Sequence, residues 1–238
     1  DGGDGGGGGG PLTTTAWVTM TTKPDRLAHP WFEATLKRTI SMCKASNATL
    51  LLQLPAQSQK GVPYEAPTSV MGLQGRHFRI RRVAFDEGPI TKLLPALRDE
   101  AIGENDTVVV CDDDIVYERD AFSLLIDSVR QHPSAVSCMC MPKTQGYAGY
   151  AFRKRVLQGL RHLTIPDSCR RIDDDVVHWY VGQSRIGLVA TKHWGDGSWT
   201  CSMLQTETDT HPEWDELIKD DRASMAQRCV ADIRTKNP

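Results

Sequence analysis

The sequence predicts a single α/β domain with a mostly parallel sheet flanked by helices. Short, strongly apolar stretches alternate along the chain with longer stretches in which apolar residues recur every three or four positions. One short stretch, Asp106–Cys111 (DTVVVC), is apolar without polar alternation, as expected of a strand covered on both faces. Alternation of strands and helices is typical of a parallel sheet with helices on both sides.

The individual elements follow from the same two periodicities. The apolar stretches predict strands at Thr15–Met20, Thr49–Leu54, His77–Phe85, Asp106–Cys111, Ala135–Met141 and Ser184–Ala190. Helical spacing predicts helices over Trp31–Ser46, Pro89–Ile102, Glu118–Pro133, a stretch beginning at Asp173, and Pro212–Ile233. Pro95 argues against an unbroken helix over the second of these ranges. Between the second and third strands, residues 55–75 form a loop rich in Pro, Gly, Gln and Ser.

Length and composition bound the class of protein. The 238 residues suit one large domain, and 39% hydrophobic with 24% charged residues is ordinary for a globular protein. We expect residues 1–12 to be a flexible glycine-rich leader, or the cut end of a longer protein, ahead of one domain at 13–238. Residues 13–141 and 142–238 are then the two halves of this domain. A net charge of −2 gives no drive towards nucleic acid, and no apolar run is long enough for a membrane span.

The cysteines and asparagines bear on the compartment. Seven cysteines, an odd number in a chain this long, do not suggest a disulfide scaffold. Cys138 and Cys140 lie two apart on one face of a predicted strand, and we expect them in the core rather than at a metal site. Two N-x-T sequons, at Asn47 and Asn105, are compatible with a secretory-pathway lumen. The sequence leaves the Golgi or secretory lumen and the cytoplasm both open.

Three consecutive aspartates, Asp112–Asp114, follow the fourth predicted strand directly. In parallel sheets with helices on both sides, ligands bind at the carboxyl ends of strands, so this triplet lies at the expected site. Mg²⁺ or Mn²⁺ prefers oxygen ligands and often takes one or two protein carboxylates, leaving positions for substrate phosphates. Asp112 and Asp114 share one side of an extended chain and so can share one such ion. The alternative is a solvated turn that ends the strand.

Five segments in order resemble GT-A fold glycosyltransferases, which have a Rossmann-like sheet, and in particular their small family-2-like members. They are VTMTTKPDRL, VAFDEGPITKLLPAL, VVVCDDDIVY with its D-x-D motif, GYAGYAFRK and IDDDVVHWYV. The resemblance covers roughly Trp17 to Tyr180, and the chain beyond His193 matches poorly. It implies a metal-dependent, inverting transfer from a nucleotide-sugar donor, a UDP- or GDP-sugar, to a hydroxyl of a glycan or glycoconjugate. It also implies that residues 13–141 are the nucleotide-sugar-binding half and residues 142–238 the acceptor or catalytic half.

The resemblance also implies roles for particular residues. Asp114 binds the metal on the donor diphosphate, with Asp112 on the metal or the ribose and Asp113 beside them in the nucleotide site. The other residues implied to contact the nucleotide or its phosphates are Thr21, Thr22, Arg26, Asp86 and Lys92. His193 and His211 are candidates for a further metal ligand, although an ordinary surface histidine is the more common case for each.

The second acidic triplet, Asp173–Asp175, is the candidate catalytic base. Inverting glycosyl transfer needs a group that takes the proton of the acceptor hydroxyl, and a neighbouring carboxylate raises the pKa of such a base. We assign the base to Asp174 or Asp175 rather than Asp173. The alternative is an acidic first turn of a helix, which the helix dipole favours.

Two other functions remain open at this stage. A sugar nucleotidylyltransferase shares the α/β plan and metal carboxylates, but the glycine-rich loop such enzymes carry after the first strand is replaced here by TTKPDRL. A non-catalytic carbohydrate-binding domain of the same fold is the third possibility. The basic run of Arg76, His77, Arg79, Arg81 and Arg82 is interpreted as a solvated strand face rather than a ligand site.

Overall fold

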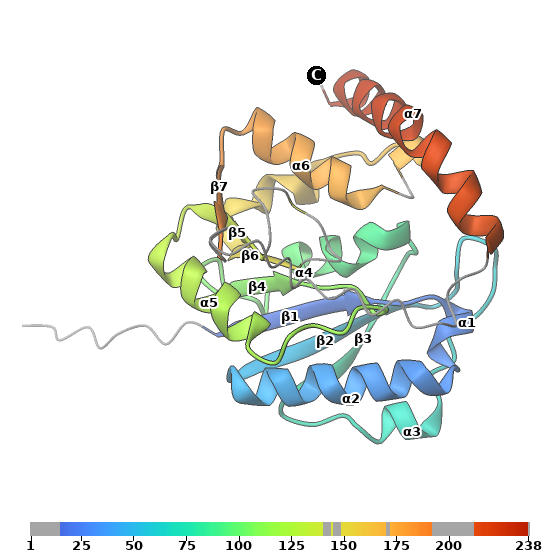
Figure 1. Ribbon diagram of the computed structural model, residues 1–238, viewed down its shortest axis with the longest axis vertical. Helices are drawn as coiled ribbons and strands as arrows, with labels where there is room; N and C mark the ends of the chain where they lie inside the picture. The colour runs from blue at the N-terminus through green and yellow to red at the C-terminus, as the bar shows by residue number, and fades with distance from the viewer. Residues whose placement is uncertain (1–14, 140–143, 145–148, 170–171, 192–211, 238) are drawn as a thin grey trace, which may run out of the picture.

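The computed structural model describes residues 15–139, 144, 149–169, 172–191 and 212–237, and for residues 212–223 only the backbone. Within this part of the chain a seven-stranded sheet has the order β3-β2-β1-β4-β6-β5-β7 (Figure 1). The strands are β1 (Ala16–Thr21), β2 (Ala48–Pro55), β3 (Phe78–Val83), β4 (Thr107–Val110), β5 (Ala135–Cys138), β6 (Tyr150–Arg153) and β7 (Gly187–Ala190). All neighbouring pairs are parallel except those of β6, which runs antiparallel to β4 and β5. The predicted α/β class with a mostly parallel sheet is confirmed.

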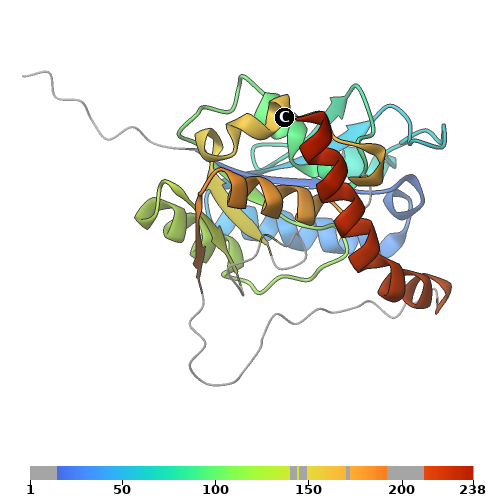
Figure 2. The ribbon, with the colours of Figure 1, turned by 90° about the horizontal axis from the view of Figure 1, so that it is seen from above.

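Helices cover both faces of the sheet. They are α1 (Pro24–Leu27), α2 (Pro30–Ala45), α3 (Thr68–Met71), α4 (Leu94–Arg98), α5 (Ala121–Gln131), α6 (Asp173–Gln183) and α7 (Pro212–Lys236), with 3-10 turns η1 (Gly88–Lys92), η2 (Lys154–Val156), η3 (Gln158–His162) and η4 (Asp167–Cys169). One core layer joins α2 and α5 to the sheet, and the other joins α4, α6 and the end of α7 to its opposite face. In Figure 2, which looks from that second side, α6 and α7 lie in front of the strands.

The pleat of the sheet explains these two layers. Along β2, Leu50 and Leu52 belong to the layer with α2, whereas Leu51 between them belongs to the opposite layer. Along β4, Val109 faces the first layer while Val108 and Val110 face the second. Successive side chains of a strand point to opposite faces, so strands buried on both sides need the uninterrupted apolar sequence seen here.

Two predicted elements differ from the structure. The predicted helix over Pro89–Ile102 is divided into η1 and α4, and Pro95 lies in the first turn of α4, where its missing N–H costs nothing. Strand β6 was not predicted at all. It follows Gly149, whose φ of +80° is a left-handed conformation that glycine adopts without strain. The glycine-aromatic composition around it hid a short strand of four residues.

The basic run around β3 makes structural contacts. Arg81 forms an ion pair with Asp99, and Arg82 Nη1 donates to the Tyr64 carbonyl oxygen at 2.7 Å. The Arg79 guanidinium lies 5.9 Å from the centre of the Trp17 ring. These contacts agree with the prediction of a strand face rather than a ligand site.

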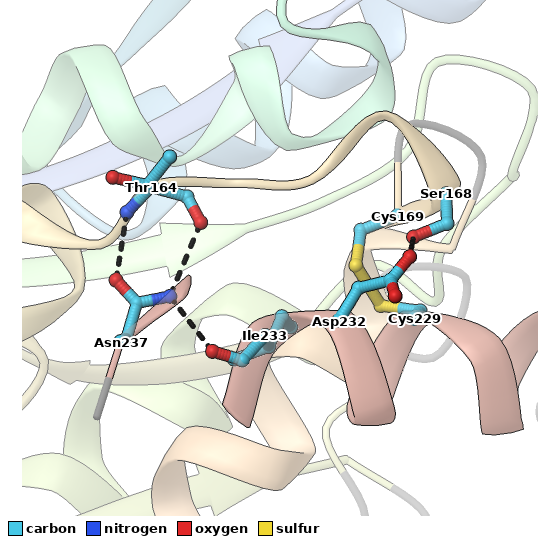
Figure 3. Close-up of a disulfide and its surroundings, with 7 residues drawn as sticks. All are labelled: Thr164, Ser168, Cys169, Cys229, Asp232, Ile233 and Asn237. Atoms are coloured by element: carbon cyan, nitrogen blue, oxygen red, sulfur yellow. Dashed lines mark hydrogen bonds between the residues drawn. A yellow bond between two sulfur atoms is a disulfide. The ribbon is translucent and has the colours of Figure 1, made fainter. Parts of the chain in front are cut away.

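A disulfide joins Cys169 in η4 to Cys229 in α7, which the cysteine count did not lead us to expect (Figure 3). The number of cysteines says nothing about which two are neighbours, and here the partners are 60 residues apart. Two side chains beside it hold the same two segments: Ser168 Oγ donates to Asp232 Oδ2 at 2.6 Å, and the Asn237 amide bonds both backbone groups of Thr164. Cys43, Cys111 and Cys138 are buried and lie outside this disulfide, and the core position expected of Cys138 is confirmed.

Replacing both disulfide cysteines by serine should lower the free energy of unfolding by about 2–4 kcal/mol, because a long closed loop then opens in the unfolded chain. For a chain of this size that corresponds to a fall in Tm of roughly 5–15 °C, measured by calorimetry. Dithiothreitol should lower the Tm of the wild type and leave that of the double variant unchanged. Equal Tm values for the two proteins under oxidising conditions would show that the bond does not form in solution.

Candidate functional site

The first acidic triplet lies at the carboxyl end of β4, in the middle of the sheet. Asp112 follows Cys111 directly after the strand, and its backbone N–H donates to the Tyr117 hydroxyl oxygen at 2.8 Å. Tyr117 is buried, and burial first of all raises its pKa well above the ordinary value, so this hydroxyl stays protonated. The tyrosine thereby closes the turn that presents the three carboxylates.

A buried lysine links the two acidic triplets. Lys92 ends η1, only 3% of its surface is exposed, and its backbone carbonyl accepts a hydrogen bond from the Thr19 hydroxyl of β1. Its Nζ lies 2.6 Å from Asp112 Oδ1 and 2.8 Å from Asp173 Oδ2, although only the first contact has well-directed hydrogen-bond geometry. The two triplets, some 60 residues apart in sequence, therefore meet at one ammonium group.

The charge of Lys92 is held by its partners. Burial alone would lower the pKa of this lysine. The carboxylates of Asp112, Asp173 and Asp174 raise it by more than burial lowers it, so the pKa of Lys92 lies well above its ordinary value. A buried ammonium group is tolerated only when it is paired and hydrogen-bonded. Lys92 is thus a permanent cation at the centre of the site.

An arginine from α1, the short helix after β1, neutralises the other two carboxylates of the first triplet. Arg26 Nη1 lies 2.9 Å from Asp113 Oδ1 and 2.9 Å from Asp114 Oδ2, and the Thr22 hydroxyl donates to Asp113 Oδ2 at 2.6 Å. Thr21 instead donates to the Gln53 carbonyl oxygen at 2.9 Å. The structure therefore brings Thr22, Arg26 and the first triplet together, while Thr21 is bonded to the neighbouring strand.

Asp113 is the most buried member of the first triplet. Burial raises its pKa to about 6, and the neighbouring charges of Asp114 and Asp112 act in the same direction. Arg26 and the Thr22 hydroxyl oppose this by favouring the charged form. With its two oxygens bonded to Arg26 and Thr22, Asp113 is placed to orient the loop after β1 rather than to meet a ligand directly.

Asp86 follows β3 at the same edge of the sheet, and its carboxylate is already engaged by its own loops. Oδ1 accepts from the Gly88 N–H at 2.8 Å, while Oδ2 accepts from the Gln59 N–H at 3.2 Å and from the Tyr64 hydroxyl at 3.3 Å. The residue before it, Phe85, is 76% exposed. The structure places Asp86 beside an exposed aromatic ring at the ligand-binding edge, and its contact with a nucleoside stays a prediction.

The second acidic triplet forms the first turn of α6. Asp173 and Asp174 are buried and Asp175 is half-buried. Asp173 makes the ion pair with Lys92, and the backbone carbonyl of Asp174 accepts from the Thr144 hydroxyl at 3.4 Å. The triplet is therefore also the acidic first turn of a helix that was its alternative interpretation, a position in which the helix dipole stabilises negative charge. Sequence reasoning underrated Asp173, because only the fold shows that it points at Lys92.

The carboxylates fit a divalent cation of the Mg²⁺ or Mn²⁺ type in one specific way. Among the described residues no group of three or more His, Cys, Asp or Glu side chains surrounds a possible metal position. Asp112 and Asp114, however, each use one oxygen for Lys92 or Arg26, and in the described part of the chain the second oxygen of each has no partner. One or two protein carboxylates are what such an ion takes when substrate phosphates complete its shell. His193 and His211 lie outside the described residues.

Tyr150 at the start of β6 is a further site residue that the sequence did not indicate. It is fully buried, and its hydroxyl has no hydrogen-bond partner among the described residues. Burial raises its pKa well above the ordinary value, and the charges of Lys92, Asp173 and Asp112 all act on it. An unpaired buried hydroxyl beside charged groups marks a position where a ligand or water completes the bonding. The sequence pointed to this region only through the family-like glycine-aromatic segment GYAGY, which ends at Tyr150.

Comparison with known proteins supports the fold. A crystal structure of 4-diphosphocytidyl-2C-methyl-D-erythritol synthase matches with a TM-score of 0.57 over 87% of this chain and 98% of that chain. At 11% sequence identity, the similarity establishes a shared α/β fold and nothing finer. No protein family and no curated protein matches the sequence. The predicted GT-A-like fold is thus supported, whereas the glycosyltransferase resemblance stays a prediction. No helix within the described residues is long and apolar enough to cross a membrane.

Changing Lys92 to Met should lower the free energy of unfolding by about 3–5 kcal/mol, because it leaves Asp112 and Asp173 without their buried counter-charge. Adding Asp173→Asn should recover part of this loss through a coupling of about 0.5–3 kcal/mol. The matched control is Lys37→Met, which breaks a pair with Glu33 on the surface of α2 and should change the stability far less, because solvent screens such pairs. Denaturant unfolding of five proteins decides the matter: the wild type, Lys92→Met, Asp173→Asn, their double variant and Lys37→Met. Equal stability of Lys92→Met and Lys37→Met would contradict the central role of Lys92.

The same comparison has a pH signature. A lysine whose pKa is raised on folding contributes stability that is fully present below its unfolded pKa, about 10.4, and is lost as pH rises through the folded value. The stability difference between wild type and Lys92→Met should therefore be constant from pH 6 to about pH 9 and shrink only in stronger alkali. A difference that disappears near neutral pH would show that Lys92 is not held as a cation.

Proposed function

We propose that the protein is a metal-dependent glycosyltransferase that moves a sugar from a nucleotide-sugar donor to a hydroxyl of a glycan or glycoconjugate. The observation that carries the proposal is the meeting of the two acidic triplets at Lys92. It puts candidate metal-binding carboxylates and candidate base carboxylates at one edge of the sheet, where such folds bind ligands. The order of the five family-like segments along the chain supports the same activity.

The first triplet and its cations would hold the donor diphosphate. Asp112 and Asp114 would hold Mn²⁺ or Mg²⁺ through the oxygens they do not share with Lys92 and Arg26. When bound, the ion supplies positive charge that neutralises the leaving diphosphate. Arg26, which is 18% exposed at its side chain, can turn from Asp114 to a phosphate oxygen, since guanidinium groups bind carboxylates and phosphates alike.

The nucleoside would lie towards the β3 side of this site. Asp86 stands at the carboxyl end of β3, with the exposed ring of Phe85 next to it. Thr21 ends β1 and Thr22 follows it, and β2 lies between β1 and β3 in the sheet. Lys92 would act here by fixing the separation of the two triplets rather than by reaching solvent, because its side chain is only 4% exposed.

The second triplet would supply the general base. In an inverting reaction the acceptor hydroxyl attacks the anomeric carbon from the face opposite the leaving diphosphate, while a carboxylate accepts the hydroxyl proton. Asp173 is held in the ion pair with Lys92, which occupies one of its carboxylate oxygens. This leaves Asp174 and Asp175, in the same helical turn, as the candidates for the base.

A second candidate function is nucleotidylyl transfer from a nucleoside triphosphate to a sugar phosphate. The comparison favours it over glycosyl transfer, because the solved neighbour is a synthase whose product carries a diphosphocytidyl group. The placement of Arg26 adds to this, since a basic residue from α1, directly after β1, does reach the acidic site although the segment after β1 lacks glycine. The two functions differ in their released product, which makes them separable by assay.

The deciding assay measures which phosphate product appears. Glycosyl transfer, or donor hydrolysis without acceptor, should release a nucleoside diphosphate from a UDP- or GDP-sugar in the presence of Mn²⁺. Nucleotidylyl transfer should instead release pyrophosphate from a nucleoside triphosphate and a sugar phosphate. Pyrophosphate without nucleoside diphosphate would replace the first proposal by the second, and neither product with a full panel of donors would leave a carbohydrate-binding domain.

Asp114→Ala should remove the metal-dependent part of nucleoside diphosphate binding while leaving the fold intact. With ligand at about 100 times its Kd, the wild type should gain roughly 2.7 kcal/mol of stability, and the variant or a chelator should abolish the gain. Asp127→Ala is the matched control, because Asp127 lies exposed on α5 and pairs only with Arg130 in the described structure. Binding that is indifferent to both chelator and Asp114→Ala would contradict the metal assignment.

Changing the base to asparagine should reduce kcat by about 10²- to 10⁴-fold with donor affinity unchanged, since general-base assistance is typically worth that much. We expect this of either Asp174→Asn or Asp175→Asn, and measurement of kcat and donor Kd for each variant identifies the residue. Asp127→Asn serves again as the control. Near wild-type kcat for both variants, or a product that retains the anomeric configuration of the donor, would rule out this mechanism.

A further inference from the structure

Two exposed asparagines lie together at the end of the sheet opposite the candidate site. Asn47 immediately precedes β2 and Asn105 precedes β4 by one residue. In the sheet register, Ala48 and Thr107 both pair with Ala16, the first residue of β1, so the two asparagines flank β1 at the same level. Both stand at the amino ends of parallel strands, whereas the acidic triplet stands at the carboxyl end of β4.

Each asparagine begins an N-x-T triplet, NAT at Asn47 and NDT at Asn105, and the sequence holds only one other asparagine. Both side chains are exposed on turns, and Asn47 has a left-handed φ of 51°. Each uses its carbonyl oxygen Oδ1, Asn47 for Arg76 and Asn105 for Arg155. The amide nitrogen Nδ2 of each has no partner among the described residues, so this atom is open to a covalent attachment.

The disulfide between Cys169 and Cys229 is an independent observation pointing to the same compartment. Disulfides persist in oxidising environments such as the secretory pathway and are rare in the cytosol. The thiols of Cys43 and Cys111 are buried, and burial raises the pKa of both, which keeps them protonated and unreactive. The bond joins two segments that are also held together by Ser168 and Asn237.

We propose that Asn47 and Asn105 are N-glycosylation sites and that the protein matures in an oxidising secretory lumen. At each site a bond forms between Nδ2 and C1 of the sugar of a polyprenyl diphosphate oligosaccharide. The C1–O bond breaks, the polyprenyl diphosphate leaves, and the amide proton passes to the base of the transferring enzyme. Roughly 20 Å of extended chain separates Asn105 from Asp112, so glycans at these positions leave the candidate site accessible.

The test is peptide mapping of the full-length protein purified from the cells that naturally produce it. Digestion with an amide-cleaving glycosidase in heavy-oxygen water should convert Asn47 and Asn105 to labelled aspartate, and alkylation without reduction should recover Cys169 and Cys229 as one linked peptide. An asparagine recovered unmodified is not a site. Both unmodified, together with free Cys169 and Cys229 thiols, would overturn the proposal.

Variants of the N-x-T triplet test whether its threonine is needed as well as its asparagine. In a eukaryotic secretory host, Asn47→Gln and Thr49→Ala should each remove one glycan, while Thr49→Ser should keep it. Enzymatic removal of the glycans from the folded protein should leave nucleotide binding within twofold of the untreated value. A mobility shift that survives in the Asn47→Gln, Asn105→Gln double variant would place the modification elsewhere and contradict the assignment.

Discussion

The site depends on one buried ammonium group. Lys92 is held between Asp112 at the end of β4 and Asp173 at the start of α6, where almost no solvent reaches it. Removing such a charge from water is costly, and the cost is offset only while both carboxylates stay within ion-pair distance. The lysine is also fixed from behind, because its carbonyl is bonded to Thr19 of β1. The position of α6 against the sheet is therefore set by electrostatics as well as by its apolar face.

This constraint explains why the chain can bring two acidic triplets together although like charges repel. Each carboxylate of the first triplet has a cationic neighbour, Lys92 for Asp112 and Arg26 for Asp113 and Asp114. The second triplet is stabilised by Lys92 and by the amino end of α6. Four residues before Asp173, the disulfide at Cys169 fixes the segment leading into α6 to the end of α7 (Figure 3). The first turn of α6 is thus held by Lys92 on the sheet side and by the disulfide through the segment that precedes it.

The sequence predicts most of the scaffold because its signals are local. Apolar runs gave β1, β2 and β4, and the stripe of Phe122, Leu125, Ile126 and Val129 gave α5, all close to their observed bounds. The strand-end position of Asp112–Asp114 followed from the same reasoning. What the sequence could not show were contacts between distant segments: Lys92 with Asp173, Cys169 with Cys229, and β6 between β4 and β5. Nothing in local composition specifies such partners, because tertiary packing alone brings them together.

The most direct test of the account is a crystal structure of the protein grown with Mn²⁺ and a nucleoside diphosphate, with the metal located by its anomalous scattering. The account predicts a single strong anomalous peak bridging the diphosphate and the carboxylates of Asp112 and Asp114. It also predicts that Lys92 remains between Asp112 and Asp173, with the side chains of Asp174 and Asp175 on the far side of the diphosphate. A metal and diphosphate bound away from this edge of the sheet, or Lys92 turned out to solvent, would contradict it.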